Sequence, residues 1–188
     1  MGTASEKIAG MRSCSVIYLQ NFGIRLDINT PQLTVTTPLI WLQFRIVCNC
    51  LPTNKIVCKF INTVQPICSF CLDPSSLELI SHIYWHCPKI KTFLHETAAR
   101  LEVAGIGYEP TKLQFLFGFH ERAFYDPHNF ITLILKKYIW SKKFINSEVS
   151  YVEFKNKLKF YAFDLSRILD IKGLNDSSEL WNNIALSL

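Results

Sequence analysis

The chain has 188 residues, of which 49% are hydrophobic, 13% aromatic and 19% charged. This globular composition and length predict one domain, or one domain with a small satellite. The longest uncharged segment, residues 28–44, is interrupted by two prolines, which excludes a membrane-spanning helix, and the net charge of +5 is only mildly basic.

The first part of the chain is the least informative. Residues 1–37 are expected to form a poorly defined N-terminal segment. From Pro38 onward, apolar residues recur at helical spacing and predict a helix that ends at Pro52. A second, short helix is expected after it, ahead of the cysteine-rich stretch.

The central stretch gathers metal-ligand residue types at ligand spacing, Cys68-x2-Cys71-x10-His82-x4-Cys87. The two residues between Cys68 and Cys71 make a tight turn that can point both sulfurs at one zinc ion, and a histidine and a cysteine can complete the tetrahedron. Such a short segment cannot bury enough apolar surface to hold its shape unaided, whereas a bound zinc contributes about 10–16 kcal/mol in peptide-sized sites. We therefore expect a structural Zn²⁺ as the cofactor of this segment.

The fourth ligand is ambiguous, because His86 lies next to Cys87. His82 and His86 would share one face of a regular helix, which favours His86. Pro88 biases Cys87 away from the helical conformation, so the helix should end there and free the thiolate to turn back towards the metal. Both ligand sets stay open on these grounds, as does a group of buried cysteines that binds no metal.

Cysteine usage and the N-terminal residues indicate the compartment. Seven cysteines is an odd number, and residues 1–6 lack the apolar core of a signal peptide. We expect a reducing intracellular compartment, nuclear or cytoplasmic, in which metal binding is favoured over disulfides.

The stretch after the motif predicts further helices. Pro88 can open a helix that ends near Gly105. A short element and a surface connection follow. Helical periodicity then marks residues 129–145 and 151–172, which should pack together as a hairpin. Gly173 can take the left-handed conformation and end the second helix.

The expected fold class is mainly α, a small helical domain built around the zinc segment with a C-terminal helical hairpin. The predicted organisation is a poorly defined N-terminal segment (1–37), helices with the zinc-binding segment (38–127), a basic helical hairpin (128–172) and a tail (173–188). The tail is acidic, and we expect it to be frayed, with Trp181 in it.

The excess positive charge falls on the predicted hairpin. Nine Lys or Arg and four Asp or Glu lie between residues 128 and 172. Lysines that flank an exposed tryptophan would suit RNA or single-stranded DNA, because ammonium groups bind phosphates and an indole stacks on an unpaired base. A solvated helix face whose lysine stems cover apolar surface explains the pattern equally well. The candidate nucleic-acid contacts on the hairpin are Lys136, Lys137, Trp140 and Lys143.

Three stretches together resemble one protein family: Trp-Leu-Gln-Phe-Arg-Ile-Val at 41–47, Leu-Pro-Thr-Asn-Lys at 51–55, and the motif at 68–88. They are similar to the reverse-transcriptase zinc-binding domain, which follows the polymerase domain in reverse transcriptases of non-long-terminal-repeat retrotransposons. The resemblance covers residues 38–170, and the metal signature is its specific part. It implies a zinc segment that helps to hold template RNA or target DNA beside the polymerase. The ligands it implies are Cys68, Cys71, His82 and Cys87, and it makes Arg45 and Lys55 candidates for contacts with the nucleic-acid backbone.

The chain departs from the family in packing and in catalytic residues. Phe93-Leu94 stands where the family has an aromatic pair after the last ligand. The chain lacks the paired-aspartate strand with which a polymerase holds the two metal ions of nucleotide addition. Some relatives carry a nuclease that begins with a Pro-Asp step, and none of the eight prolines here is followed by Asp.

Other catalytic motifs are incomplete as well. His95-Glu96 and His120-Glu121 lack the second histidine of a metalloprotease helix, and the sequence has no glycine-rich phosphate loop. Four protein ligands would leave zinc no open position for water. We therefore expect a non-catalytic, zinc-stabilised nucleic-acid-binding portion of a retrotransposon reverse transcriptase that occurs as a separate chain, and not an enzyme.

Two other roles fit the sequence. Apolar side chains such as Trp41, Phe44 and Trp140 could dock on a polymerase domain, on another protein or on a second copy of the chain. Alternatively, the chain could be a decayed retroelement fragment that binds no nucleic acid. Salt-dependent binding of nucleic acid would separate the expected function from both.

Overall fold

The computed structural model describes residues 37–119 and 126–188. Residues 1–36 of the predicted N-terminal segment, and the pair His120-Glu121, lie outside this part. The mainly α fold is confirmed: the described residues form helices and one isolated antiparallel bridge, between Ile67 and Leu77. The elements are α2 (Thr37–Val47), α3 (Asn54–Val57), the π-helical turn η1 (His82–His86), α4 (Pro88–Val103), α5 (Lys112–Phe117), α6 (Pro127–Phe144), α7 (Tyr151–Ile171) and α8 (Asn175–Ser187).

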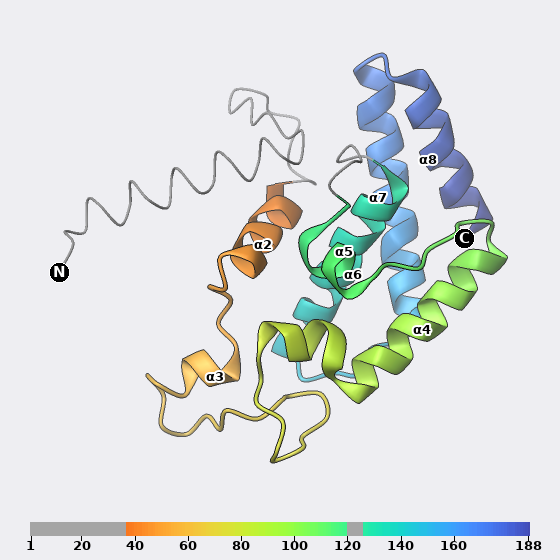
Figure 1. Ribbon diagram of the computed structural model, residues 1–188. Helices are drawn as coiled ribbons and strands as arrows, with labels where there is room; N and C mark the ends of the chain where they lie inside the picture. Colours follow the sequence, from red (N-terminus) through yellow and green to blue (C-terminus); the bar gives the residue numbers. More distant parts are fainter. Residues whose placement is uncertain (1–36, 120–125) are drawn as a thin grey trace, which may run out of the picture.

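Helix α6 lies in the middle of the fold and packs against α2 and α7 (Figure 1). Its stretch from Phe130 to Leu135 is apolar except for Thr132, so apolar side chains point to every side of the helix there, and such a stretch has to be enclosed. The residues from Asn129 to Lys136 are buried without interruption. This apolar helix is still no membrane span, since none of the helices in the described part is long and apolar enough to cross a bilayer.

The C-terminal residues form a helix rather than the frayed tail that we expected. Gly173 takes the left-handed conformation that the sequence predicts, with φ of 72°, and the chain then turns back so that α8 packs along α7 (Figure 1). Trp181 is fully buried, with its ring 5.1 Å from that of Phe130 in an edge-to-face contact. The prediction of a frayed tail is therefore wrong, because the apolar side chains of α8 recur at helical spacing and complete the core. These side chains are Trp181, Ile184, Ala185 and Leu188.

Helix α4 connects the cysteine-rich segment to the core. It begins at Pro88, as predicted, contacts η1 at its start and packs against α7. Phe93 is buried between the rings of Tyr138 and Phe154, at 5.6 and 6.1 Å. The single aromatic residue at this corner is thus packed against two others from α6 and α7.

Candidate metal centre

The structure brings together Cys68, Cys71, His82 and Cys87, whose ligand atoms all lie within 4.8 Å of one another. The Sγ atoms of Cys68 and Cys87 are 3.9 Å apart, and Sγ of Cys71 is 3.4 Å from Nε2 of His82. Two sulfurs on a tetrahedral zinc, each at about 2.3 Å from it, are roughly 3.8 Å apart. The four side chains are therefore placed to hold one metal ion.

The turn η1 explains why Cys87, and not His86, joins the group. The backbone N–H of Cys87 donates to the carbonyl of His82 at 2.8 Å, a hydrogen bond one residue longer than in an α-helix. This wide turn, and the extended conformation of Cys87 before Pro88 (φ −61°, ψ 123°), return the thiol to the side of His82. His86 is exposed, with its Nε2 2.8 Å from Nζ of Lys112.

The turn between Cys68 and Cys71 is held by backbone contacts on both sides. The N–H of Cys68 donates to the carbonyl of Ser76, and the N–H of Leu72 to that of Cys68, both at 3.0 Å. Leu72 adopts a positive φ of 55°, which lets the chain reverse directly after the second cysteine. The bridge between residues 67 and 77 closes this small loop.

Glu78 fastens the cysteine turn to the rest of the fold, although the sequence analysis did not select it. Its side chain is fully buried, and its carboxylate accepts hydrogen bonds from the N–H groups of Asn54 at 2.6 Å and Ser69 at 2.9 Å, and from the Ser69 hydroxyl. Nζ of Lys143 lies 3.0 Å from the same carboxylate. Because these partners come from α3, the cysteine turn and α6, no local pattern in the sequence could reveal the role of Glu78.

The electrostatics of the group suit metal binding. Burial lowers the pKa of His82, which favours the neutral imidazole that a metal requires. The thiol of Cys68 donates to Cys87 and is buried, so its own pKa is raised. The same hydrogen bond lowers the pKa of Cys87, helped by the N–H groups of Ile90 and Lys89 at the start of α4. The lowered pKa favours deprotonation of Cys87, and a bound metal would displace the protons of the other thiols.

The nucleic-acid contacts predicted on α6 are wrong for two of the four residues. Lys136 is 1% exposed, and its Nζ donates to Oε1 of Gln43 at 2.6 Å and to the carbonyl of Leu116 at 3.1 Å. Trp140 is 8% exposed, so its indole cannot stack on a base. The prediction treated α6 as a helix with one solvent face, whereas its residues from Asn129 to Lys136 are all buried, as are Trp140 and Lys142.

The other predicted contacts differ in accessibility. Lys143 is largely engaged, because its Nζ pairs with Glu78 and donates to the carbonyl of Pro52 at 3.2 Å. Lys137 is half-buried. Arg45 and Lys55 are exposed. The accessible part of the predicted set therefore lies on α2 and α3 rather than on the hairpin.

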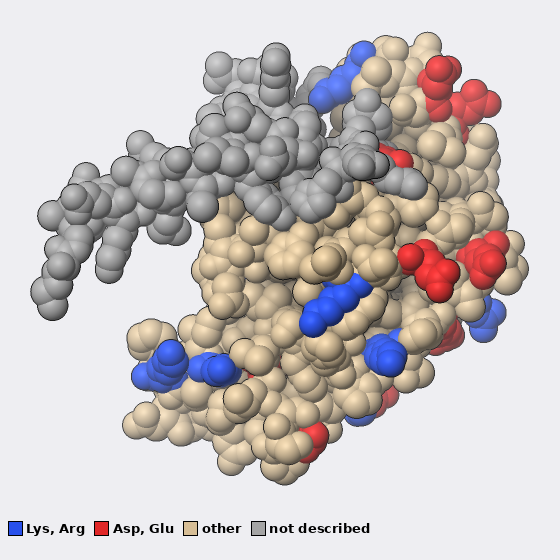
Figure 2. All heavy atoms as spheres, viewed as in Figure 1, with Lys and Arg blue, Asp and Glu red and all other residues tan. Residues whose placement is uncertain are grey.

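The sequence analysis missed a second group of exposed residues near α3. Lys59 is exposed, and the adjacent Phe60 has 81% of its surface exposed. Basic side chains gather over α3 in the space-filling view (Figure 2). Nδ2 of Asn54 donates to the carbonyl of Ile67 at 3.0 Å, so α3 is attached directly to the loop of the cysteines.

Comparisons with protein-family models, with curated proteins and with solved structures find no match for this chain. The features of the chain that bear on function are therefore its motif and geometry: a mainly helical domain with a Cys-Cys-His-Cys group that could hold a metal ion.

Proposed function

We propose that Cys68, Cys71, His82 and Cys87 bind one zinc ion and that this ion is structural. The convergence of the four ligand atoms carries the proposal. Three thiolates and an imidazole favour zinc over hard cations, which prefer oxygen ligands. Four protein ligands also fill the tetrahedron and leave no position for a reacting water, so the domain is proposed to be non-catalytic.

The proposed ion would stabilise the part of the chain that has the least regular structure. Between Leu51 and Pro88, the only helices are the short α3 and η1. A metal bound to the cysteine turn in the middle of this segment and to His82 and Cys87 near its end would join the turn to the start of α4, which packs against α7. We expect the segment to lose its structure without metal, since a site of this kind supplies folding free energy directly.

We further propose that the surface around α3 binds RNA or single-stranded DNA. Arg45, Lys55 and Lys59 supply exposed cations for phosphates, and Phe60 supplies an exposed ring on which a base can stack. The attachment of α3 to the cysteine loop through Asn54 would make this surface dependent on the metal. Its proposed origin, the C-terminal region of a retrotransposon reverse transcriptase, is supported by the sequence motif.

The metal proposal is tested by native mass spectrometry with and without a chelator. We expect one zinc per chain, lost in Cys68→Ser, together with loss of structure in the 51–87 segment as measured by hydrogen exchange. Cys50→Ser, at an exposed cysteine outside the group, is the matched control and should retain the metal. Protein that stays fully folded and metal-free after chelation would contradict the proposal.

The nucleic-acid proposal is tested by fluorescence anisotropy with a labelled single-stranded RNA between 50 and 200 mM salt. Replacing Lys55 and Lys59 with alanine should weaken binding and reduce the slope of log K against log salt by roughly 1.4, at about 0.7 per phosphate contact on single strands. The control pair is Lys157, on α7, and Lys172, directly after it, both of which are exposed. Replacing these two lysines with alanine should leave binding unchanged.

Two results would redirect this second proposal. Absence of binding at low salt, or equal effects of the two lysine pairs, would contradict it. Self-association without affinity for nucleic acid would support the interaction role instead, for which Trp41 remains available with 59% of its surface exposed.

A further inference from the structure

A cleft of about 610 Å³ lies between η1, α4, the segment that follows α4, and α5. Trp85, Leu94 and Phe115 are among the side chains that line one part of it, and Tyr108 and Phe119 line another. Nothing in the proposed zinc or nucleic-acid function uses this cleft.

Aromatic rings form part of its wall. The rings of Trp85 and Phe115 are 5.8 Å apart and tilted, and Trp85 is only half-buried. Phe119 is half-buried as well, with its ring 5.5 Å from that of His128. Partly accessible aromatic faces attract cations through their negative quadrupole.

The charge of the cleft is opposite to that of the chain. Glu102 and Glu109 line it, and both are exposed, whereas no Lys or Arg is among the lining residues in the described part of the chain. Acidic side chains gather over the end of α4 in the space-filling view (Figure 2). In a protein with a net charge of +5, a cleft lined by two glutamates, two histidines and no Lys or Arg in the described part favours a positively charged occupant.

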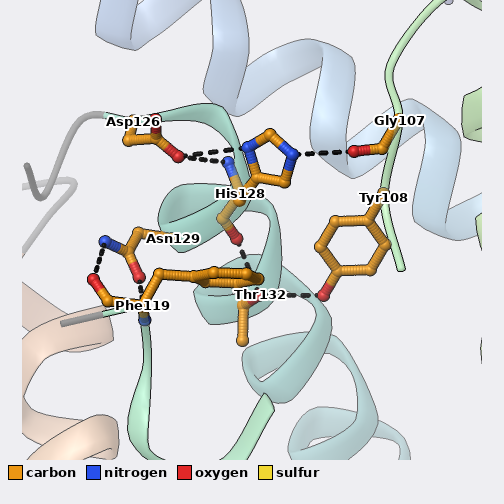
Figure 3. A network of polar contacts seen from close by, with 7 residues as sticks. All are labelled: Gly107, Tyr108, Phe119, Asp126, His128, Asn129 and Thr132. Carbon is orange, nitrogen blue, oxygen red and sulfur yellow. Dashed lines mark hydrogen bonds and ion pairs between the residues drawn. The ribbon is translucent and has the colours of Figure 1, made fainter. Parts of the chain in front are cut away.

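The wall formed by the segment after α4 is held rigidly (Figure 3). The imidazole of His128 contacts two oxygen atoms. Its Nδ1 lies 3.2 Å from Oδ1 of Asp126, and its Nε2 lies 2.7 Å from the carbonyl oxygen of Gly107. The hydroxyl of Tyr108 lies 2.8 Å from that of Thr132 on α6.

Phe119, whose ring packs against His128, is anchored to α6 as well. The side-chain amide of Asn129 accepts from the N–H of Phe119 at 2.8 Å and donates to its carbonyl at 3.2 Å (Figure 3). Asn129 is buried. The aromatic wall is therefore preformed, which reduces the entropy lost on binding.

We propose that this cleft binds an arginine side chain of a basic protein segment. The planar guanidinium would lie against the accessible ring of Trp85, and its N–H groups would donate to the carboxylates of Glu102 and Glu109. Arginine fits better than lysine, because the flat guanidinium can stack on a ring and donate in its plane at the same time.

The test uses the full chain, loaded with zinc, and a fluorescently labelled Gly-Arg-Gly-Arg-Gly peptide in an anisotropy titration. We expect saturable binding that is at least tenfold weaker for the same peptide with citrulline, the neutral isostere of arginine. Ala99→Lys places a positive charge on an exposed lining position of α4 and should weaken binding about tenfold. Asn183→Lys, an exposed position on α8, is the matched control and should bind like the parent chain.

A second pair of variants separates the cleft from the general field of the protein. Glu102→Gln with Glu109→Gln should weaken binding about tenfold, whereas Asp176→Asn with Glu179→Gln on α8 makes the same change in net charge and should not. Equal binding of the citrulline peptide, no saturable binding, or equal effects of the cleft and α8 variants would each overturn the proposal. These readouts do not depend on nucleic acid, so they stand apart from the test of the α3 surface.

Discussion

The carboxylate of Glu78 lies 2.9 Å from the backbone N–H of Ser69, inside the turn that joins Cys68 to Cys71. The same carboxylate pairs with Nζ of Lys143 on α6, so one buried side chain fixes the cysteine turn to the central helix. The position of two of the proposed ligands thus depends on a residue outside the proposed ligand set.

Glu78→Gln should therefore weaken both folding and metal binding. The amide keeps the size of the side chain but removes the charge opposite Lys143 and can accept through one oxygen only, so we expect a loss of about 3 kcal/mol in the free energy of unfolding. Urea unfolding with saturating zinc measures this loss, and competition with a chelator measures the affinity for metal. Glu148→Gln is the control, because its contact with Lys89, at 3.5 Å, is largely exposed and should contribute below about 1 kcal/mol.

The identity of the fourth ligand gives a second prediction. Cys87→Ser should remove stoichiometric zinc, whereas His86→Ala should retain it, because His86 is exposed and its ring contacts Lys112. Native mass spectrometry of the two variants measures this difference directly. Retention of the metal by Cys87→Ser and its loss in His86→Ala would assign the site to the alternative set of ligands.

Lys136 predicts a dependence of stability on pH. Burial lowers its pKa in the folded protein well below the usual value, which is about 10.4 in an unfolded chain. At pH values between the folded and the unfolded pKa of Lys136, the unfolded chain binds more protons than the folded protein. The free energy of unfolding should therefore rise with pH in this range, by up to about 1.4 kcal/mol per pH unit, and should fall again as the pH is lowered.

Lys136→Met should remove that rise. The methionine fills a similar volume, and the contact between Nε2 of Gln43 and the carbonyl of Leu116, at 3.0 Å, is kept. Urea unfolding of the zinc-loaded proteins at several pH values between 7 and 10 provides the comparison. Parallel curves for the parent chain and the variant would mean that Lys136 does not titrate differently in the two states.

The burial of Trp181 predicts that the C-terminal helix is required for stability. Trp181→Ala should cost about 3–5 kcal/mol, since it removes a fully buried ring that contacts Phe130 in α6. Leu186→Ala, on the exposed side of α8, should change stability by less than about 0.5 kcal/mol. Thermal unfolding followed by circular dichroism measures both, and equal effects would contradict the packing described for α8.

The sequence predicted the elements whose signals are local. Pro88 opens α4, and the positive φ of Gly173 ends the hairpin helix as expected. The spacing of the cysteines also selected residues that the structure brings together. In each case the determinant is the stereochemistry of one residue or the geometry of a short turn, which a single sequence displays.

What the sequence did not show depends on contacts between distant residues. Lys136 and Trp140 appeared to be surface residues, because the periodicity of one helix does not tell how many neighbours surround it. The tail was predicted to be frayed because its acidic residues outweighed the apolar stripe around Trp181. Glu78 escaped notice for the same reason, since its partners belong to three separate elements.

The wide turn at residues 82–86 makes chain length part of the proposed ligand set. Adding one residue between His82 and Cys87 would rotate the thiol away from the face of His82 and from the other three side chains, whereas removing one would leave the i, i+4 spacing that keeps two side chains on one face of an α-helix. We therefore expect substitutions inside this interval to be tolerated far better than insertions. The spacing of the motif is then a geometric requirement, because the number of residues between His82 and Cys87 sets the direction in which the last thiol points.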